Sequence, residues 1–318
     1  MFAYAIRRLA SACIVVLCVL VFLALLVRFI PGDPLTSAGD LAMGEDASLT
    51  ERIREEMGVN DPVLIQIWEY ARGVIVHGDI GTNVITKRPV SEEIARVLPH
   101  TLALAASTVI FSLTIGSLLG ILAAAKSGGV TDRLLSMVAI GAWTTPSYLG
   151  ALLLLLICVV WLDILPAVGA GQFSDITDYS IHLIMPTIAL SLPWIGIIAR
   201  NLRSYLLDIV NELYMTSARA FGISESKIFL KYGLRNALIP TIALVALGVG
   251  HLLAGAVYVE IIFARPGLGS MLINSIIRRN FPVTRGAVFV IVIIFVSVNL
   301  LADLFYRVID PRVRVDKQ

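Results

Sequence analysis

Residues 211–240 read NELYMTSARAFGISESKIFLKYGLRNALIP, a polar and basic stretch between two segments that are apolar enough to span a membrane. An Ala- and Arg-rich segment runs into Gly222, a residue suited to the left-handed position just past a helix end. Ser224 can then cap a second helix, with Glu225 in its first turn, where the helix dipole favours an anion. The pattern predicts a helix-turn-helix hairpin.

The second helix of this hairpin presents Ile228, Phe229 and Tyr232 at helical spacing. Spacing alone fits two readings. The apolar side of the hairpin packs on its own protein, or it docks a partner.

The composition is that of a membrane protein. Of 318 residues, 58% are hydrophobic and 15% are charged, and the mean hydropathy is +0.87, outside the range of soluble domains of this size. Six apolar runs are each close to the roughly 20 residues that a membrane-spanning helix needs. They are Leu9–Val27, Thr101–Ala125, Leu134–Val160, His182–Ala199, Ala237–Phe263 and Ala287–Leu304. We therefore predict an all-α polytopic fold with six transmembrane helices.

Six spans place both termini on one side, and the distribution of basic residues indicates which side. Lys and Arg gather in the N-terminus, residues 126–133, residues 201–236 and the C-terminal tail, which predicts that these segments are cytoplasmic. Residues 28–99 contain more Asp and Glu than Lys and Arg, as expected of an extracytoplasmic segment. A short stretch runs against this rule as a local exception, and it contains Arg265, Arg278, Arg279 and Arg285.

The sequence lacks the motifs that are typical of several other functional classes. The phosphate-binding pattern GxxxxGK[ST] is absent, so ATP chemistry of that type requires a separate motor protein. Membrane-embedded Asp, Glu and Arg are scarce, which disfavours an ion-coupled transporter, and GxSxG and HExxH are missing, which disfavours an intramembrane protease. The net charge of +2 is dispersed over loops and gives no nucleic-acid surface. A passive channel or scaffold would leave the hairpin unexplained.

The hairpin and the stretch that follows it carry a resemblance. Tyr214, Thr216, Ala218-Arg219-Ala220, Gly222 and Leu234-Arg235-Asn236-Ala237-Leu238-Ile239-Pro240 are similar to the EAA loop of ABC importer permeases, in the variant of the dipeptide/oligopeptide/nickel family. Thr216-Ser217-Ala218 occupies the place of Glu-Ala-Ala, so the acidic residue of the general motif is missing and we assign no role to a carboxylate there.

Short blocks along nearly the whole chain resemble the same family. In order they are Pro31-Gly32-Asp33-Pro34, Gly78-Asp79-Ile80-Gly81-Thr82, Arg88-Pro89-Val90, Leu98-Pro99-His100-Thr101-Leu102, Pro266-Gly267-Leu268-Gly269, Phe281-Pro282-Val283 and Asp310-Pro311-Arg312. Each block alone is weak evidence for the family. Because all of them occur in this order along one chain, coincidence does not explain them. Turn chemistry accounts for most of the Gly and Pro positions.

The resemblance implies a type I ABC importer permease fold with an extracytoplasmic insertion between the first two helices. We expect a first helix in 1–30, a helical insertion in 31–99, a permease core in 100–308 with a coupling loop at 211–240, and a cytoplasmic tail in 309–318. In the insertion, the Gly78–Gly81 turn leads to a helix begun by Ser91-Glu92-Glu93.

The resemblance also implies the partners. They are a second, homologous permease subunit, two cytoplasmic ATPase subunits that use ATP and Mg²⁺, an extracytoplasmic solute-binding protein and the lipid of the bacterial inner membrane. The chain itself would bind no cofactor and perform no enzymatic step. Contact with the ATPase is expected from Thr216, Ser217, Ala218, Arg219, Gly222, Ile228, Phe229, Tyr232, Arg235, Asn236 and Pro240.

Few polar or helix-breaking residues lie within the spans, and these are candidates for a translocation path: His251, Glu260, Pro146 and Pro193. His251 makes a polar contact across a helix interface, lines the path or, least favoured, binds a metal. Glu260 can equally be structural near its span end, and the prolines either shape the path or only set helix packing. The family that the chain resembles handles dipeptides, longer peptides, and nickel or metal chelates. The absence of a His/Cys/Asp cluster favours di- or oligopeptides over free metal, but a chelated metal would need no such ligands, so nickel or a metal chelate stays the alternative.

Overall fold

The computed structural model describes residues 2–29 and 63–309, and in this part of the chain every regular element is helical. The long helices are α1 (Phe2–Phe29), α5 (Val90–Ala125), α8 (Ile176–Val210), α11 (Leu234–Ile262) and α13 (Phe281–Ile309). The shorter elements are α4 (Val63–Arg72), η1 (Gly73–His77), α6 (Val130–Thr144), α7 (Ser147–Leu154), η2 (Leu155–Trp161), α9 (Leu213–Ala220), α10 (Glu225–Lys227), η3 (Ile228–Gly233) and α12 (Leu268–Ile277). Elements labelled η are π-helical turns.

The all-α prediction is confirmed, and the long helices correspond to the predicted spans. Among the described residues, four helical stretches are long and apolar enough to cross a membrane, namely Val90–Ala125, Ile176–Val210, Glu225–Ile262 (α10, η3 and α11 together) and Phe281–Ala302. The bent pair Val130–Thr144 and Ser147–Trp161 makes a fifth if it counts as one span, and Arg8–Leu23 of α1 is a shorter apolar stretch. Part of the predicted insertion (30–62) and the end of the tail (310–318) lie outside the described residues, and with them the Pro31–Pro34 and Asp310–Arg312 blocks.

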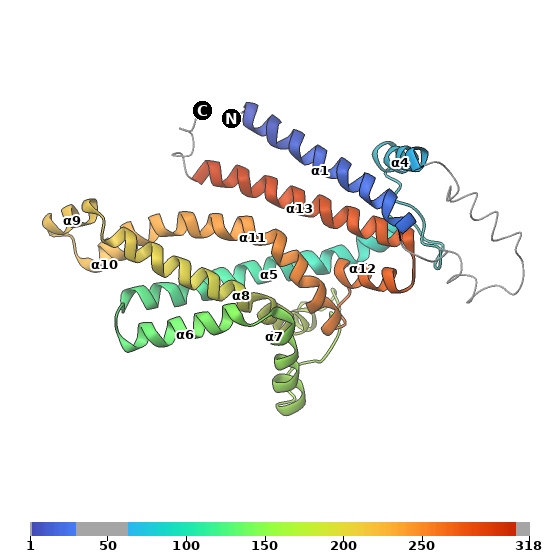
Figure 1. Cartoon of the computed structure of the whole chain (residues 1–318). Helices are drawn as coiled ribbons and strands as arrows, with labels where there is room; N and C mark the ends of the chain where they lie inside the picture. Colours follow the sequence, from blue (N-terminus) through green and yellow to red (C-terminus); the bar gives the residue numbers. More distant parts are fainter. Residues whose placement is uncertain (1, 30–62, 310–318) are drawn as a thin grey trace, which may run out of the picture. The chain divides into compact units, whose positions relative to one another are not determined.

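The third predicted span, Leu134–Val160, is broken at Pro146, one of the helix-breaking residues noted in the sequence, and lies in α6, α7 and η2. It bends by 102° between α6 and α7, as Figure 1 shows. Pro146 has no N–H to continue the ladder, and the hydroxyls of Thr144 and Thr145 both donate to the Gly141 carbonyl, at 3.2 and 2.7 Å. Side-chain hydrogen bonds thus terminate α6 where the proline prevents its continuation.

The helix predicted to begin at Ser91 and the span predicted from Thr101 are a single helix. α5 starts at Val90, has Glu92 and Glu93 in its first turn and continues through Pro99 to Ala125. The glutamates are favourable at this position because they face the positive end of the helix dipole. The helix therefore leads directly out of the predicted insertion into the membrane.

The helices form two compact units, which we describe separately. Unit 1 consists of Met1–Thr101 and Pro266–Leu300, and unit 2 of Leu102–Arg265 and Leu301–Gln318, in each case for the described residues. The core of unit 1 gathers Val90 and Ile94 from α5 with Leu268 of α12 and Val283 of α13. The Leu268 N–H also donates to Thr101 Oγ1 at 2.9 Å, which joins the start of α12 to α5.

Unit 2 has two buried apolar clusters. One lies among α5, α7, α8 and α11 and includes Leu104, Met185 and Leu252. The other consists of Ala124, Leu202, Leu206 and Ala237. Small residues allow close helix packing, since a Cβ at Gly120 of α5 would lie 2.8 Å from the Ala199 carbonyl oxygen of α8.

Candidate coupling loop

The predicted hairpin is present at one end of unit 2, where α9 and α10 extend beyond α8 and α11 (Figure 1). Only two residues separate the end of α8 at Val210 from the start of α9 at Leu213. The second limb is short. α10 passes into η3 and then directly into α11, so residues 234–240, including Pro240, form the first turns of that helix. Both limbs are therefore joined to long helices with almost no intervening loop.

The turn at Gly222 has the predicted left-handed conformation, with φ of 76°. The Gly222 N–H donates to the Arg219 carbonyl at 2.9 Å and the Ile223 N–H donates to the Ala218 carbonyl at 3.2 Å. This pair of bonds is the Schellman arrangement that closes a helix C-terminus. Nothing lies within 4 Å of the position that a Cβ at Gly222 would occupy, so conformation and not space requires glycine here.

Ser224 stands at the N-cap position of α10, but its hydroxyl makes no capping hydrogen bond. Its carbonyl accepts from the N–H groups of Lys227 and Ile228. Across the turn, Arg219 Nε donates to Glu225 Oε1 at 2.7 Å, and Nη2 donates to Oε2 at 3.4 Å. The arginine of the first limb thus holds the first residue of the second limb.

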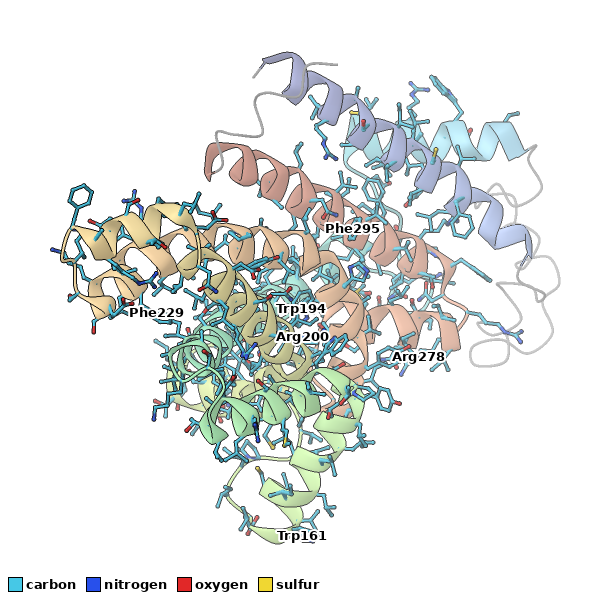
Figure 2. All side chains as sticks on the ribbon, turned by 60° about the vertical axis from the view of Figure 1, so that its left-hand side comes forward. Trp161, Trp194, Arg200, Phe229, Arg278 and Phe295 are labelled. Atoms are coloured by element: carbon cyan, nitrogen blue, oxygen red, sulfur yellow. The ribbon has the colours of Figure 1, made fainter. Side chains whose placement is uncertain are left out.

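The side chains of the second limb divide between the interior and the surface. Ile228 is completely buried, with 0% exposure, and Phe229 packs on the cluster of Ala124, Leu202, Leu206 and Ala237; Figure 2 labels Phe229 on this limb. Of the three residues predicted at helical spacing, only Tyr232 is exposed. Ile228 and Phe229 therefore attach the hairpin to the rest of unit 2. For these two residues the structure shows packing on their own chain, and not the docking of a partner.

The exposed apolar surface of the hairpin comes mainly from residues that sequence reasoning missed. Phe221 is 87% exposed and Leu213 is 84% exposed, and Tyr214 and Leu230 are also exposed. The available signal was an aromatic residue directly before the helix-terminating Gly222 in an otherwise polar turn. Large apolar side chains so exposed on a structured turn are typical of an interaction site.

The remaining predicted contact residues lie on the same hairpin and its root. Thr216, Ser217, Arg235 and Asn236 are exposed, and Ala218 and Arg219 are half-buried. Asn236 Nδ2 donates to the Tyr214 hydroxyl at 3.3 Å, which connects the first turn of α11 to α9. Except for Ile228 and Phe229, which pack on the chain itself, and Pro240, which is half-buried inside α11, the predicted residues lie on the hairpin and the first turn of α11.

The candidates for a translocation path do not form one site. Pro146 lies at the bend between α6 and α7, and Pro193 lies inside α8. His251 and Glu260 are nine positions apart on α11, about two and a half turns at 3.6 residues per turn, so they face opposite directions. His251 is exposed and Glu260 is 1% exposed. They cannot line the same surface.

Glu260 lies near a second buried ionic group, Arg265. Burial lowers the pKa of the Arg265 guanidinium, and the charge of Glu260 acts in the opposite direction, as does Tyr179. The Arg265 guanidinium also lies 4.9 Å from the centre of the Tyr179 ring. Glu260 thus lies buried beside a cation at the end of α11. Across the described residues, no group of three or more His, Cys, Asp or Glu side chains could hold a metal ion.

Arg200 is a further residue that the span prediction missed, because the predicted span ended at Ala199. Its guanidinium lies 5.3 Å from the centre of the Trp143 ring, and Figure 2 shows its position on α8. It flanks a cavity of about 170 Å³ among α5, α6 and α8 that is otherwise mainly apolar. A cation–π contact of this kind stabilises an arginine in a largely apolar environment.

Comparisons with known proteins agree with this arrangement. A family model described as "Binding-protein-dependent transport system inner membrane component" matches residues 116–315, and one for the N-terminal part of such membrane components matches residues 1–105. The chain is 35% identical over 316 residues to the glutathione transport system permease protein GsiC of Pectobacterium atrosepticum, and 37% over 315 residues to GsiC of Salmonella typhimurium. Both alignments cover 99% of either protein.

A solved structure gives the same fold. A chain of the MetNI methionine ABC transporter, in a crystal form described as inward facing, matches with a TM-score of 0.56 at 19% identity. The match covers 68% of the present chain and 96% of that chain. The predicted helical fold of a type I importer permease is thereby confirmed.

Proposed function

The chain belongs to the family of inner membrane components of binding-protein-dependent transport systems, and we propose that it is the permease subunit of an ATP-driven importer of short peptides. The observation that supports the peptide assignment is the similarity to glutathione permeases over the full length of both chains. Glutathione is itself a small peptide. The separate solute-binding protein would select the substrate, and the permease would provide the path.

The proposed complex contains a second, homologous permease subunit, two ATPase subunits and the binding protein. ATP and Mg²⁺ would be bound and used by the ATPase subunits, with no ATP chemistry in this chain. Both termini and the hairpin would be cytoplasmic, as the distribution of Lys and Arg indicates. The hairpin would enter a cleft of an ATPase subunit with Phe221, Leu213 and Tyr232, which are exposed.

The proposed mechanism is alternating access driven through the hairpin. Closure of the ATPase subunits would displace the turn at Gly222. Because α9 follows α8 after two residues and η3 continues into α11, the displacement would move both long helices and not a flexible loop. Arg219 and Glu225 would keep the two limbs together during this motion. ATP binding would shift the population toward the outward-open state only to the extent that the ATPase binds that state more tightly.

The test is uptake into proteoliposomes that contain the purified complex, with labelled glutathione and di- and tripeptides as substrates. ATP- and binding-protein-dependent accumulation of any of these peptides supports the proposal. The ligand released from the purified binding protein is identified in parallel by mass spectrometry and metal analysis. Recovery of nickel or a metal chelate, without peptide uptake, overturns the peptide assignment. A complex with a hydrolysis-deficient ATPase subunit serves as the control.

A further inference from the structure

Four exposed cations occur on two neighbouring segments of unit 1. Lys87 and Arg88 belong to the turn 83–88 that precedes α5, and Arg278 and Arg279 form the corner between α12 and α13. Figure 2 labels Arg278 at the end of α12. We call these four residues the basic surface. Arg278 and Arg279 belong to the stretch that runs against the distribution of Lys and Arg in the rest of the chain.

A buried asparagine pair holds the two segments together. Asn280 Nδ2 donates to Asn83 Oδ1 at 2.6 Å, and both asparagines are buried. Asn280 directly follows Arg279. On the other segment, the Lys87 N–H donates to the Asn83 carbonyl and the Asn83 N–H donates to the Arg88 carbonyl, both at 2.9 Å. Asn83 thus bonds to the backbone of Lys87 and Arg88 and to the side chain of Asn280, the residue that follows Arg279.

The nearby acidic group is already engaged. Asn83 Nδ2 lies 2.8 Å from each carboxylate oxygen of Glu93, and the Thr86 hydroxyl donates to Glu93 Oε1 at 2.7 Å. Glu93 therefore serves to fix the turn. Glu92, the residue before Glu93, is exposed.

Backbone conformation at two of the cations is unusual. Lys87 has φ of 58° and Arg279 has φ of 52°. The left-handed region costs a non-glycine residue about 1 kcal/mol or more and is commonly occupied by Gly or Asn. The surrounding hydrogen bonds maintain this conformation at two long cationic side chains, which are thereby presented on rigid turns.

The basic surface and the hairpin belong to opposite sides of the membrane in the proposed topology. The turn 83–88 precedes α5, whose 36 residues extend about 54 Å at 1.5 Å per residue, and the cytoplasmic segment 126–133 follows that helix. The basic surface is then extracytoplasmic, where Lys and Arg are disfavoured. Exposed positive charge on that side is suited to a negatively charged partner.

We propose that the basic surface is a docking site for an acidic face of the extracytoplasmic solute-binding protein. This inference rests on the proposed function only in requiring a binding-protein-dependent importer, and it is independent of the substrate. Charges at the rim of such an interface increase the association rate and make binding depend on ionic strength. Loading of the transporter would accordingly be fastest at low salt.

The test uses the complete transporter in nanodiscs and the binding protein purified with it, with association followed by biolayer interferometry at several salt concentrations. The charge-reversal variant Lys87→Glu/Arg88→Glu/Arg278→Glu/Arg279→Glu is expected to associate at least about tenfold more slowly at low salt and to lose most of the salt dependence. Arg133→Glu, an exposed cation in the segment at the other end of α5, is the matched control and should associate as the wild type does.

An unchanged association rate in a reversal variant that inserts and melts as the wild type does overturns the proposal. Reduced binding of that variant to anionic phospholipid vesicles would then identify a lipid-headgroup surface. If four reversals prevent insertion, the pairs Lys87→Gln/Arg88→Gln and Arg278→Gln/Arg279→Gln are measured separately. Failed peptide uptake with salt-dependent, reversal-sensitive docking would contradict the substrate assignment and leave this inference standing.

Discussion

Arg203 of α8 holds Asp132 of α6 through two short hydrogen bonds, from Nε to Oδ1 at 2.6 Å and from Nη2 to Oδ2 at 2.7 Å. Asp132 is only 4% exposed, and its Oδ2 also accepts from the Gly128 N–H at 2.9 Å. The pair connects the short turn between α5 and α6 to the helix that leads into the hairpin. Displacement of α8 by the hairpin would therefore be transmitted to α6.

Asp132→Asn is expected to destabilise the protein, because Arg203 loses its carboxylate partner in a partly buried position. Arg203 is about one-third exposed, so we expect a loss of about 1–3 kcal/mol, less than for a fully buried pair. The melting temperature of the detergent-solubilised complex measures it. Glu225→Gln removes an ion pair of similar length at an exposed site and should cost at most about 0.5 kcal/mol. Equal melting temperatures for Asp132→Asn and Glu225→Gln would contradict the assignment of Arg203–Asp132 as the more stabilising of the two ion pairs.

Gly222→Pro is expected to uncouple ATP hydrolysis from transport. Proline fixes φ near −65°, whereas Gly222 has φ of 76°, and proline removes the N–H that donates to the Arg219 carbonyl. Because the turn is exposed, insertion and thermal stability should remain close to wild type while uptake in proteoliposomes is lost. Gly222→Ala, which keeps the N–H and costs about 1 kcal/mol of backbone strain, should retain part of the uptake. Normal uptake by the proline variant would show that this turn does not couple.

Phe221→Ala and Phe229→Ala separate docking from stability. Phe221 is 87% exposed, so its truncation should weaken co-purification of the ATPase subunits and leave the melting temperature unchanged. Phe229 packs on a buried cluster, so its truncation should cost about 2–4 kcal/mol of stability, in part because a cavity forms. The reverse pattern, with ATPase lost only in the Phe229 variant at unchanged stability, would overturn this division.

The hairpin shows what local sequence determines and what it does not. The left-handed turn at Gly222 follows from residues within five positions of it, and it was predicted. Helical spacing placed Ile228, Phe229 and Tyr232 near one another but contained no information about which surface they meet. The buried cluster that receives Phe229 draws on α8 and α11, which flank the hairpin, and on Ala124 of α5, which is remote in sequence. Sequence alone therefore predicts an ATPase contact for Phe229, whereas in the structure Phe229 packs within its own chain.

The spans show the same limit. Hydropathy identified the apolar helices, because each one alone matches the membrane thickness. A break at Pro146 follows from the sequence, but its angle of 102° does not, since a proline within a span kinks or ends a helix according to what replaces the missing hydrogen bond. By contrast, the separation of His251 from Glu260 on opposite faces of α11 was accessible from helical periodicity alone. The basic surface depends on the Asn83–Asn280 contact between segments far apart in the chain, which sequence could not supply.

Gly248→Ala is expected to disturb the packing of α11 on α8. A Cβ at Gly248 would overlap the Cη2 and Cζ3 atoms of the Trp194 indole, whose place on α8 is labelled in Figure 2. Overpacking of this kind costs about 1–3 kcal/mol, which the melting temperature of the solubilised complex measures. Gly141→Ala on α6 is the matched control, since nothing lies within 4 Å of its Cβ position. Adding Trp194→Phe, which removes the clashing part of the indole, should restore part of the stability of Gly248→Ala. If Gly248→Ala melts as the wild type does, the Trp194 side chain has room to turn away from the added methyl group. The contact at Gly248 would then not hold α8 and α11 together when the hairpin moves.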